Sequence, residues 1–274
     1  MGRIDLKKLL AITAVVACLL LTIGNTALGQ TGDAQPDGNA HPNVGAFLLP
    51  RLADGSLRII CSGTLVTSRV FLTASHCTDF ALSQGFSETW VTFDPNFGTD
   101  AAHNVFSTPY HGTIVHNSDY KQPYHSDFSL ILLDAPVTGI APATIAPIGF
   151  LDSLRDAGTI KTTPYLNVGY GSSEKVVVKK EGPTFPFDGV RKWTISGFHT
   201  LEPRFIHLNQ NLNQGYSGTG YGDSGGPTFV DTAGGLVVIS VVSTGDAPLY
   251  STSVNTRVDT AEAWAFLGPY LALR

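Results

Sequence analysis

The chain consists of short strand-like runs, each bounded by turn-forming residues, and this pattern restricts it to an all-β fold. The first half holds six such runs, at residues 44–49, 57–66, 70–73, 89–93, 112–116 and 128–133. The second half holds six more, at residues 166–170, 175–178, 192–196, 205–208, 236–242 and 251–258. No convincing helical pattern lies between them. The two sets predict two packed six-stranded antiparallel β-barrels, over residues 44–150 and 151–258.

One helix is predicted, over the C-terminal residues 259–274. Asp259 is suited to cap its first turn, and Glu262 follows three residues later, as in a capping box. The side chains around and after Glu262 give the helix an apolar face. Pro269 is expected to end or kink it.

Composition allows a sizeable core and excludes some classes of partner. Of the 274 residues, 43% are hydrophobic and only 14% are charged, so wholesale disorder is not expected. The net charge is -5 without a long run of either sign, which gives no basis for binding nucleic acid. No metal or other cofactor is expected, because a zinc-type spacing is absent among His103, His111, His116 and His125.

Residues 1–29 have the three parts of a signal peptide. Basic residues at the start are followed by an uncharged apolar run over 9–23, and small residues precede Gln30. We therefore predict cleavage near Gln30 and export to the extracellular or periplasmic space, with no membrane association afterwards. Two alternatives stay open. One is a membrane anchor, although the run is shorter than the roughly 20 residues that span a bilayer. The other is lipid attachment at Cys18.

The segment 30–43 is polar and rich in turn residues, which predicts a flexible extension or a short propeptide. If Cys18 leaves with the signal peptide, Cys61 and Cys77 remain, and an oxidising compartment favours a disulfide between them. Such a bridge closes a loop of about 15 residues, which is worth roughly 3 kcal/mol in the chain-entropy model. Two buried free thiols are the alternative.

A serine between glycines is the first of three segments with catalytic potential. In Gly222-Asp223-Ser224-Gly225-Gly226-Pro227, the glycines permit positive φ angles and a close approach of the backbone to a substrate. Such a turn can aim the amides of Gly222 and Ser224 at one point beside the Ser224 hydroxyl, forming an oxyanion hole. An ordinary glycine-rich turn is the alternative.

The other two segments supply a histidine and an aspartate. His76 follows an apolar run, and its neutral imidazole can accept and return a proton near neutral pH. Asp127 precedes the apolar run 128–133, where a buried carboxylate needs a donor such as an imidazole N–H. Each residue alone would more often be structural. Together with the serine segment they indicate nucleophilic catalysis.

The three segments, TASHC at 73–77, SDFSLILL at 126–133 and GDSGGP at 222–227, resemble in kind and order those of the chymotrypsin/trypsin superfamily of serine proteases. Their catalytic positions are 51 and 97 residues apart, which suits that family's two-barrel layout. The resemblance extends over roughly residues 44–268 through four further segments: CSGTL at 61–65, NVGYG at 167–171, VSTG at 242–245 and VNTRV at 254–258.

The resemblance implies a secreted serine endopeptidase that acts on protein or peptide substrates through an acyl-enzyme intermediate. Its catalytic residues would be His76, Asp127 and Ser224, with the Gly222 and Ser224 amides as the oxyanion hole. Ser243 resembles the strand serine that supports the triad carboxylate in this family. We expect the protein to be a monomer.

The sequence departs from trypsin-like relatives at the substrate pocket. Gly218 stands where those relatives place the aspartate that binds Arg or Lys, and Gly220 replaces a cysteine that braces the pocket. A roomy, neutral pocket that prefers apolar or uncharged residues is therefore expected, although Asp246 could bring charge to the rim. Its expected lining is Gly218, Thr219, Ser243, Gly245 and Ser253.

The activation route departs from the family pattern as well. The nearest match to the new N-terminus of an activated zymogen is Val44-Gly45-Ala46, but Asn43 precedes it instead of Arg or Lys. Activation by a tryptic cleavage is therefore not expected. Asp223 would be costly to bury unpaired, so a cation that the sequence does not identify is expected to serve it.

Two other functions are consistent with parts of the pattern. A catalytically silent relative that serves as a binding module would be expected to lack a triad member, and none is missing here. An exported esterase would share the letters G-x-S-x-G, but a long helix should follow the serine in that fold. Pro227 and the strand-like run 228–230 follow instead, which favours the protease.

Overall fold

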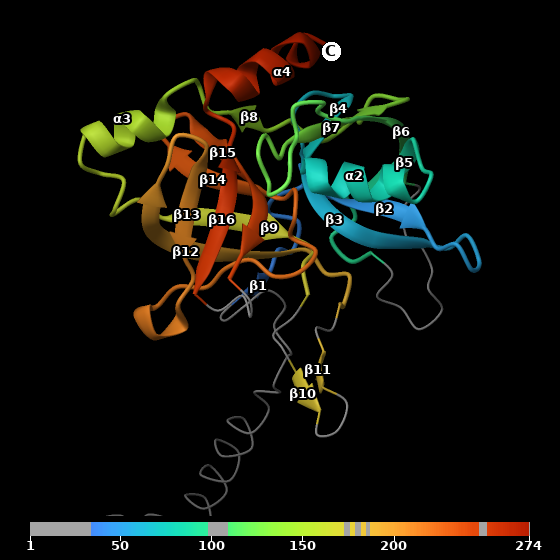
Figure 1. Ribbon diagram of the computed structural model, residues 1–274, viewed down its shortest axis with the longest axis horizontal. Coiled ribbons are helices and arrows are strands. Elements are labelled where there is room, and N and C mark those ends of the chain that lie inside the picture. The colour runs from blue at the N-terminus through green and yellow to red at the C-terminus, as the bar shows by residue number, and fades with distance from the viewer. Residues whose placement is uncertain are drawn as a thin grey trace, which may run out of the picture.

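The first barrel is closed by six antiparallel strands in the order β2-β3-β4-β7-β6-β5, and it forms the blue-to-green half of Figure 1. The strands are β2 (Val44–Pro50), β3 (Leu57–Leu65), β4 (Val70–Thr73), β5 (Glu88–Thr92), β6 (Tyr110–Val115) and β7 (Ser129–Leu133). Pairing of β2 with β5 closes the barrel. Its interior is filled by fully buried side chains such as Phe47, Phe71 and Leu130.

The second barrel is closed by β9-β12-β13-β16-β15-β14, with β9 paired to both β12 and β14. These strands are β9 (Tyr165–Gly169), β12 (Lys192–Leu201), β13 (Phe205–Asn209), β14 (Pro227–Thr232), β15 (Gly235–Gly245) and β16 (Thr252–Arg257). Two short strands add to its outside: β1 (Gln35–Pro36) pairs with β12, and β8 (Thr144–Ile145) runs parallel to β15. The prediction of two six-stranded antiparallel barrels is confirmed.

Membership of the second barrel differs from the prediction in one strand. The run at 175–178 does not join the barrel: its residues Val176–Val178 form β10, which pairs only with β11 (Gly182–Thr184) in a separate hairpin. The sixth barrel strand is β14, which directly follows the serine segment. Its apolar stretch is short, and only pairing with Asn167 and Leu166 of β9 and with β15 identifies it as a barrel strand.

The prediction that no helix lies between the strands was wrong. Helix α2 (Ser75–Ser83) begins immediately after β4, and α3 (Phe150–Asp156) follows the link between the barrels. There is also a 3₁₀ turn, η1 (Leu212–Gln214). These elements are at most nine residues long, too short for a 3.6-residue periodicity in the sequence to reveal them. The buried side chains of Cys77 and Ala81 hold α2 against the first barrel.

The C-terminal helix exists, but its ends differ from those expected. Helix α4 spans Ala261–Leu271, and its cap is Thr260, whose hydroxyl accepts from the Ala263 amide at 3.1 Å. Asp259 instead accepts from the Leu151 amide of α3 at 2.7 Å. Pro269 lies inside the last turns and does not end the helix.

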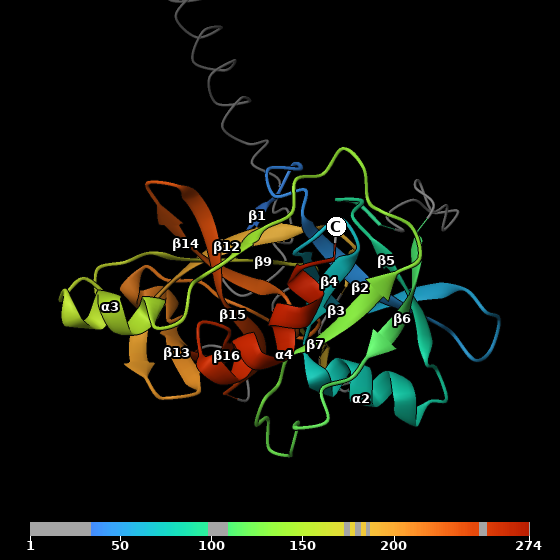
Figure 2. The same ribbon diagram turned by 90° about the horizontal axis from the view of Figure 1, so that it is seen from above.

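Segments from each end of the chain bind the two barrels together. Figure 2 shows α4, which follows the last strand of the second barrel, lying beside β4 and β7 of the first. Phe266 of α4 packs on Phe128 with ring centroids 5.8 Å apart. At the other end, Asp37 is buried and its carboxylate accepts from Nε of Arg191 at 2.9 Å. Asp37 thereby ties the segment 34–43, for which a flexible extension or short propeptide is predicted, to the second barrel.

The computed structural model describes residues 34–97, 109–172, 176–178, 182–184, 187–246 and 251–273. The predicted signal peptide, its cleavage site and Cys18 lie outside the described residues. Within these ranges, no helix has both the length and the apolar character needed to cross a membrane.

Candidate active site

The histidine and the aspartate meet at the first turn of α2. His76 is the second residue of this helix, and Asp127 is fully buried just before β7. One carboxylate oxygen of Asp127, Oδ1, accepts from the His76 amide at 2.8 Å, and the other, Oδ2, is 2.8 Å from Nδ1 of the His76 ring. The Asp127 carboxylate therefore holds both the backbone and the ring of His76, and Nε2, on the other side of the ring, is directed away from it.

A second barrel element completes the environment of this carboxylate. The hydroxyl of Ser243, on β15, donates to Oδ2 of Asp127. A buried carboxylate is tolerated only when hydrogen bonds replace its hydration, and here Asp127 accepts three. The contact crosses from the second barrel to the first. Ser243 therefore supports the carboxylate, as the resemblance implied.

The serine segment forms a tight turn that needs its glycines. Gly222 has φ 96° and Gly225 has φ 82°, in the region that side chains disfavour. A Cβ on Gly225 would lie 2.2 Å from Oγ1 of Thr73 and 2.4 Å from the Ser62 carbonyl oxygen, so the turn packs directly against the first barrel. Ser224 is partly exposed between these glycines.

The orientation of the Gly222 amide follows from a neighbouring hydrogen bond. The carbonyl of Tyr221 accepts from the amide of Ser172 at 2.6 Å. In a trans peptide the carbonyl and the following N–H point in opposite directions. The Gly222 N–H therefore points away from Ser172.

Ser62 is a structural residue of the site that sequence reasoning missed. Its amide donates to the Ser224 carbonyl at 2.8 Å, and its hydroxyl donates to the Gly222 carbonyl at 2.9 Å. The same hydroxyl accepts from the Tyr170 amide at 2.9 Å. The signal was present in the CSGTL segment as a small polar residue directly after the half-cystine Cys61, but only the tertiary contact shows its role.

Asp223 is buried behind the turn, with its side chain directed at the NVGYG segment. The carboxylate accepts from the amides of Gly171, at 2.9 Å, and Gly220, at 2.7 Å. A Cβ on Gly169 or Gly171 would lie 2.2 Å from a carboxylate oxygen, so both glycines are needed for the carboxylate to fit. The cation that the sequence leads us to expect there stays a prediction.

A cavity of about 390 Å³ brings the predicted catalytic residues together, because both His76 and Ser224 line it. Of the residues expected to line the substrate pocket, Thr219, Ser243 and Gly245 line this cavity, with Gly220, Tyr221 and Asp246 also on its walls. The cavity extends to Tyr124, whose ring meets the His76 ring edge-on with centroids 5.8 Å apart. Sequence reasoning missed Tyr124, and no motif marks it.

Two predicted pocket residues lie behind this lining. Ser253 is fully buried, with its hydroxyl 3.0 Å from that of Thr219. Gly218 is buried against Gln210, whose side-chain oxygen accepts from the Thr219 amide at 3.1 Å. Both residues therefore pack behind Thr219, on the side away from the cavity. The paired strands β13 and β16 and the side chain of Gln210 occupy the space there.

The described residues contain one cluster with the proximity of metal ligands, formed by Cys61, Cys77 and His76. Cys61 and Cys77 are joined in a disulfide, as predicted, so their sulfurs are not available as thiolate ligands. The disulfide joins β3 to α2 next to His76.

The comparisons with known proteins identify a family for this chain but no individual relative. The family model described as Trypsin matches residues 32–265. No curated protein matches the chain.

Proposed function

The chain belongs to the trypsin family, and on this premise we propose that it is a secreted serine endopeptidase with the triad His76, Asp127 and Ser224. The observation that carries the proposal is the shared carboxylate of Asp127. It orders the His76 ring through Nδ1 and the His76 backbone through its amide. An imidazole held in this way has one tautomer, with Nε2 free to act as a base toward the cavity that Ser224 lines.

In the proposed reaction, Ser224 attacks the scissile carbonyl while His76 accepts the hydroxyl proton. Asp127 stabilises the imidazolium, and His76 then returns the proton to the leaving amine. The amides of Gly222 and Ser224 would donate to the oxyanion; the bond from Ser172 to Tyr221 supports this role for Gly222. Water activated by His76 would hydrolyse the acyl-enzyme.

A fluorophosphonate probe tests the proposed function on the purified protein. We expect labelling of the wild type and cleavage of casein, with neither in Ser224→Ala. Labelling without cleavage of casein or of a peptide library would favour an exported esterase. No labelling of a folded protein would contradict the proposed function and favour the binding-module alternative. N-terminal sequencing of the exported form tests the secretion part, with a start near Gln30 expected.

The preferred substrate is proposed to carry an uncharged residue on the acyl side of the scissile bond. The cavity wall is lined by the Thr219 hydroxyl, which Ser253 contacts from behind. Among the described residues that line the cavity, Asp246 alone carries a carboxylate. It accepts from the amides of Ser251 and Thr252 at 3.1 Å and 2.6 Å.

Gly218→Asp is not expected to create cleavage after Arg or Lys. A Cβ at this position would lie 2.1 Å from the side-chain oxygen of Gln210 and 2.4 Å from its Cβ, so Gln210 and the Thr219 amide that it braces must shift. We expect kcat/KM on the best uncharged substrate to fall at least about tenfold and the melting temperature to drop. Parallel assays with Arg, Lys and Phe peptide nitroanilides measure this.

The double variant Gly218→Asp, Gln210→Gly is the matched control, because it removes both the side-chain oxygen and the Cβ of Gln210 that crowd position 218. It should recover melting temperature relative to the single variant. Efficient cleavage after Arg by the single variant would show that the space behind Thr219 is open, contrary to this prediction.

A further inference from the structure

Ser126, which precedes Asp127, has an unusual backbone conformation. Its φ is 54°, in the left-handed region that non-glycine residues rarely adopt, and the residue is buried. Its carbonyl oxygen accepts from the Ser75 hydroxyl at 3.2 Å and from the side-chain amide of Asn117 at 3.1 Å. A conformation of this kind persists only where surrounding contacts impose it.

The side chain of Ser126 is held from the other half of the molecule. Its hydroxyl donates to Oε1 of Glu262, in the first turn of α4. The second carboxylate oxygen of Glu262 accepts from Nε of Arg204 at 3.1 Å, and Arg204 belongs to the turn between β12 and β13. Glu262 therefore joins the second barrel to the residue next to Asp127.

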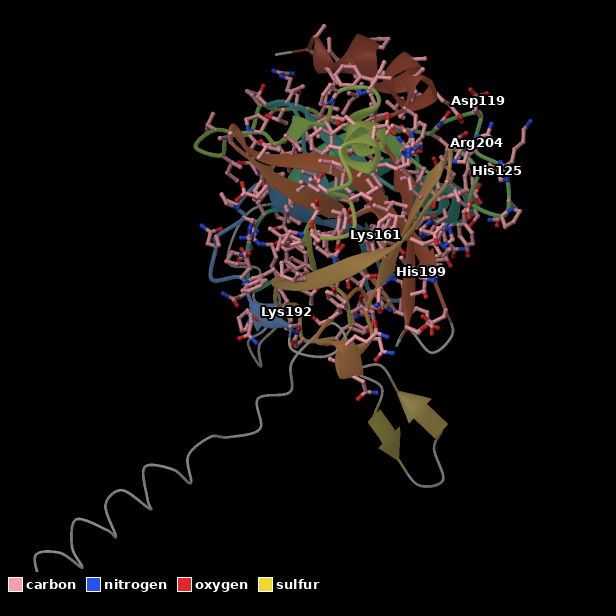
Figure 3. All side chains as sticks on the ribbon, turned by 90° about the vertical axis from the view of Figure 1, so that its left-hand side faces the viewer. Asp119, His125, Lys161, Lys192, His199 and Arg204 are labelled. Atoms are coloured by element: carbon pink, nitrogen blue, oxygen red, sulfur yellow. A yellow bond between two sulfur atoms is a disulfide. The ribbon has the colours of Figure 1, made fainter. Side chains whose placement is uncertain are left out.

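The charges around Glu262 keep it an acceptor. The hydrogen bond from Ser126 is the largest influence and lowers the pKa of the Glu262 carboxyl; burial opposes it, and Arg204 and His125 lower that pKa further. Figure 3 shows Arg204 and His125 on the same edge of the molecule, below the C-terminal helix. The combined effect is that the pKa of the Glu262 carboxyl lies below its ordinary value, so this carboxylate is ionised at neutral pH.

Helix α4 gives Glu262 a fixed position relative to both barrels. The indole N–H of Trp264 donates to the Ala146 carbonyl at 3.1 Å, and Phe266 packs on Phe128, the residue directly after Asp127. The backbone on both sides of Asp127 is thus held by one helix, through the hydrogen bond to Ser126 and through the ring of Phe128.

We propose that Glu262 is a positioning residue for the triad: by binding the Ser126 hydroxyl, it holds Ser126 left-handed and so keeps the Asp127 carboxylate on His76. The inference rests on the proposed function. It does not place Glu262 in contact with substrate. A displacement of the carboxylate by about 1 Å can cost on the order of 100-fold in rate, which leaves room for a measurable effect.

The test begins with Glu262→Ala and Glu262→Gln, assayed per fluorophosphonate-titrated active site. We expect kcat of the alanine variant to fall about tenfold, with KM within about twofold, because carboxylate placement affects proton transfer rather than binding. The glutamine variant keeps an oxygen that accepts from Ser126 and should retain most of kcat. Glu202→Ala is the matched control: Glu202, two residues before Arg204, pairs with His207 at 3.2 Å, and its loss should leave kcat unchanged.

Ser126→Ala and Ser126→Gly separate positioning from general stability. Both remove the hydrogen bond to Glu262, but glycine accepts φ 54° without strain and alanine does not. We expect kcat to fall about tenfold in Ser126→Ala and less than about threefold in Ser126→Gly. Adding Glu262→Ala to the Ser126→Gly variant should change kcat by less than about twofold, because the hydrogen bond between positions 126 and 262 is already absent in that variant.

The inference would be overturned if the wild type is active and both Glu262→Ala and Ser126→Ala keep kcat within twofold of the wild-type value. Equal losses in Ser126→Ala and Ser126→Gly would overturn it too, since the left-handed backbone would then not matter. If Glu262→Ala folds too poorly for the assay, the Ser126 pair and Glu262→Gln decide the outcome. A folded wild type without labelling or hydrolysis contradicts the proposed function instead, which keeps the two failures distinct.

Discussion

Asp127→Asn is expected to leave the protein folded and to lower kcat by about 10⁴-fold. The reason is that the two oxygens of the Asp127 carboxylate have different hydrogen-bond partners. Oδ1 accepts from the His76 amide, so asparagine must place its carbonyl oxygen there and its NH₂ group against Nδ1 of the ring. Nδ1 then becomes an acceptor, Nε2 carries the proton, and His76 can no longer accept the hydroxyl proton of Ser224.

Steady-state hydrolysis of a peptide substrate and thermal unfolding measure the two halves of this prediction. Asp119→Asn is the control, because Asp119 is exposed on the same loop and its carboxylate has no part in the proposed chemistry. It should keep kcat within about twofold. If Asp127→Asn retained more than about a tenth of wild-type kcat, His76 would not depend on Asp127 for its tautomer, and the proposed triad would be wrong.

Asp37→Ala is expected to destabilise the protein by roughly 3–5 kcal/mol, because it leaves the buried guanidinium of Arg191 without its counter-charge. Both side chains of this ion pair are inaccessible to solvent. The guanidinium also donates to the Val44 and Phe93 carbonyls, at 2.8 Å and 3.1 Å, and to Asn39 at 2.7 Å. Arg191 thereby ties the N-terminal segment, the first barrel and β12 together.

Urea unfolding at neutral pH measures this loss, with Asp156→Ala as the control. Asp156 also pairs with an arginine, but on the surface, with 70% of its side chain exposed, so its removal should leave the unfolding midpoint unchanged. An equal effect of the two substitutions would show that the Asp37–Arg191 pair makes no special contribution to stability.

The same pair predicts how stability depends on pH. Burial raises the pKa of the Asp37 carboxyl, but hydrogen bonds from His41 and the charge of Arg191 outweigh it, so the pKa lies below the ordinary value. The stabilisation is therefore complete above the unfolded-state pKa of about 3.9 and is lost as the pH falls through the lower folded-state value. The difference between wild type and Asp37→Asn should accordingly shrink below about pH 4 in urea titrations.

The buried pair also bears on maturation. Removal of residues 34–43 would expose or leave unpaired the guanidinium that Asp37 and Asn39 now bind. We therefore expect the mature chain to begin before Ala34, so that trimming of the whole segment 30–43 does not occur. Mass spectrometry of the exported protein gives the start directly, and a mature form that begins at Val44 would contradict this expectation.

Local chemistry in the sequence was enough to identify the residues of the candidate triad. The glycines around Ser224 permit the tight turn that exposes its hydroxyl. The cysteine next to His76 and the apolar strand after Asp127 single out the other two residues of the candidate triad. Eleven of the twelve barrel strands were also predictable, all but β14, since period-two patterns and turn residues are encoded within a few neighbouring positions. The disulfide was predictable because two cysteines remained to pair.

Interactions between distant segments decided what the sequence could not show. The short helix α2 and the barrel strand β14 are defined by packing and pairing, as are the cavity walls, where Ser253 lies behind Thr219. The sequence predicts flexibility for the polar residues 34–43 because the arginine that pairs with Asp37, Arg191, lies about 150 positions away. Glu262 looked like part of a capping box, yet its carboxylate binds Ser126, 136 positions earlier.

Residue type and short spacing were therefore sufficient to predict the all-β class, the disulfide pair and the chemical identity of the candidate catalytic groups. The tertiary structure alone decided which groups hold that machinery in place: Ser62 under the serine turn, Arg191 between the barrels, and Glu262 behind Asp127. A hydrogen bond between residues more than a hundred positions apart depends on chain topology and side-chain geometry, and neither is written in local periodicity.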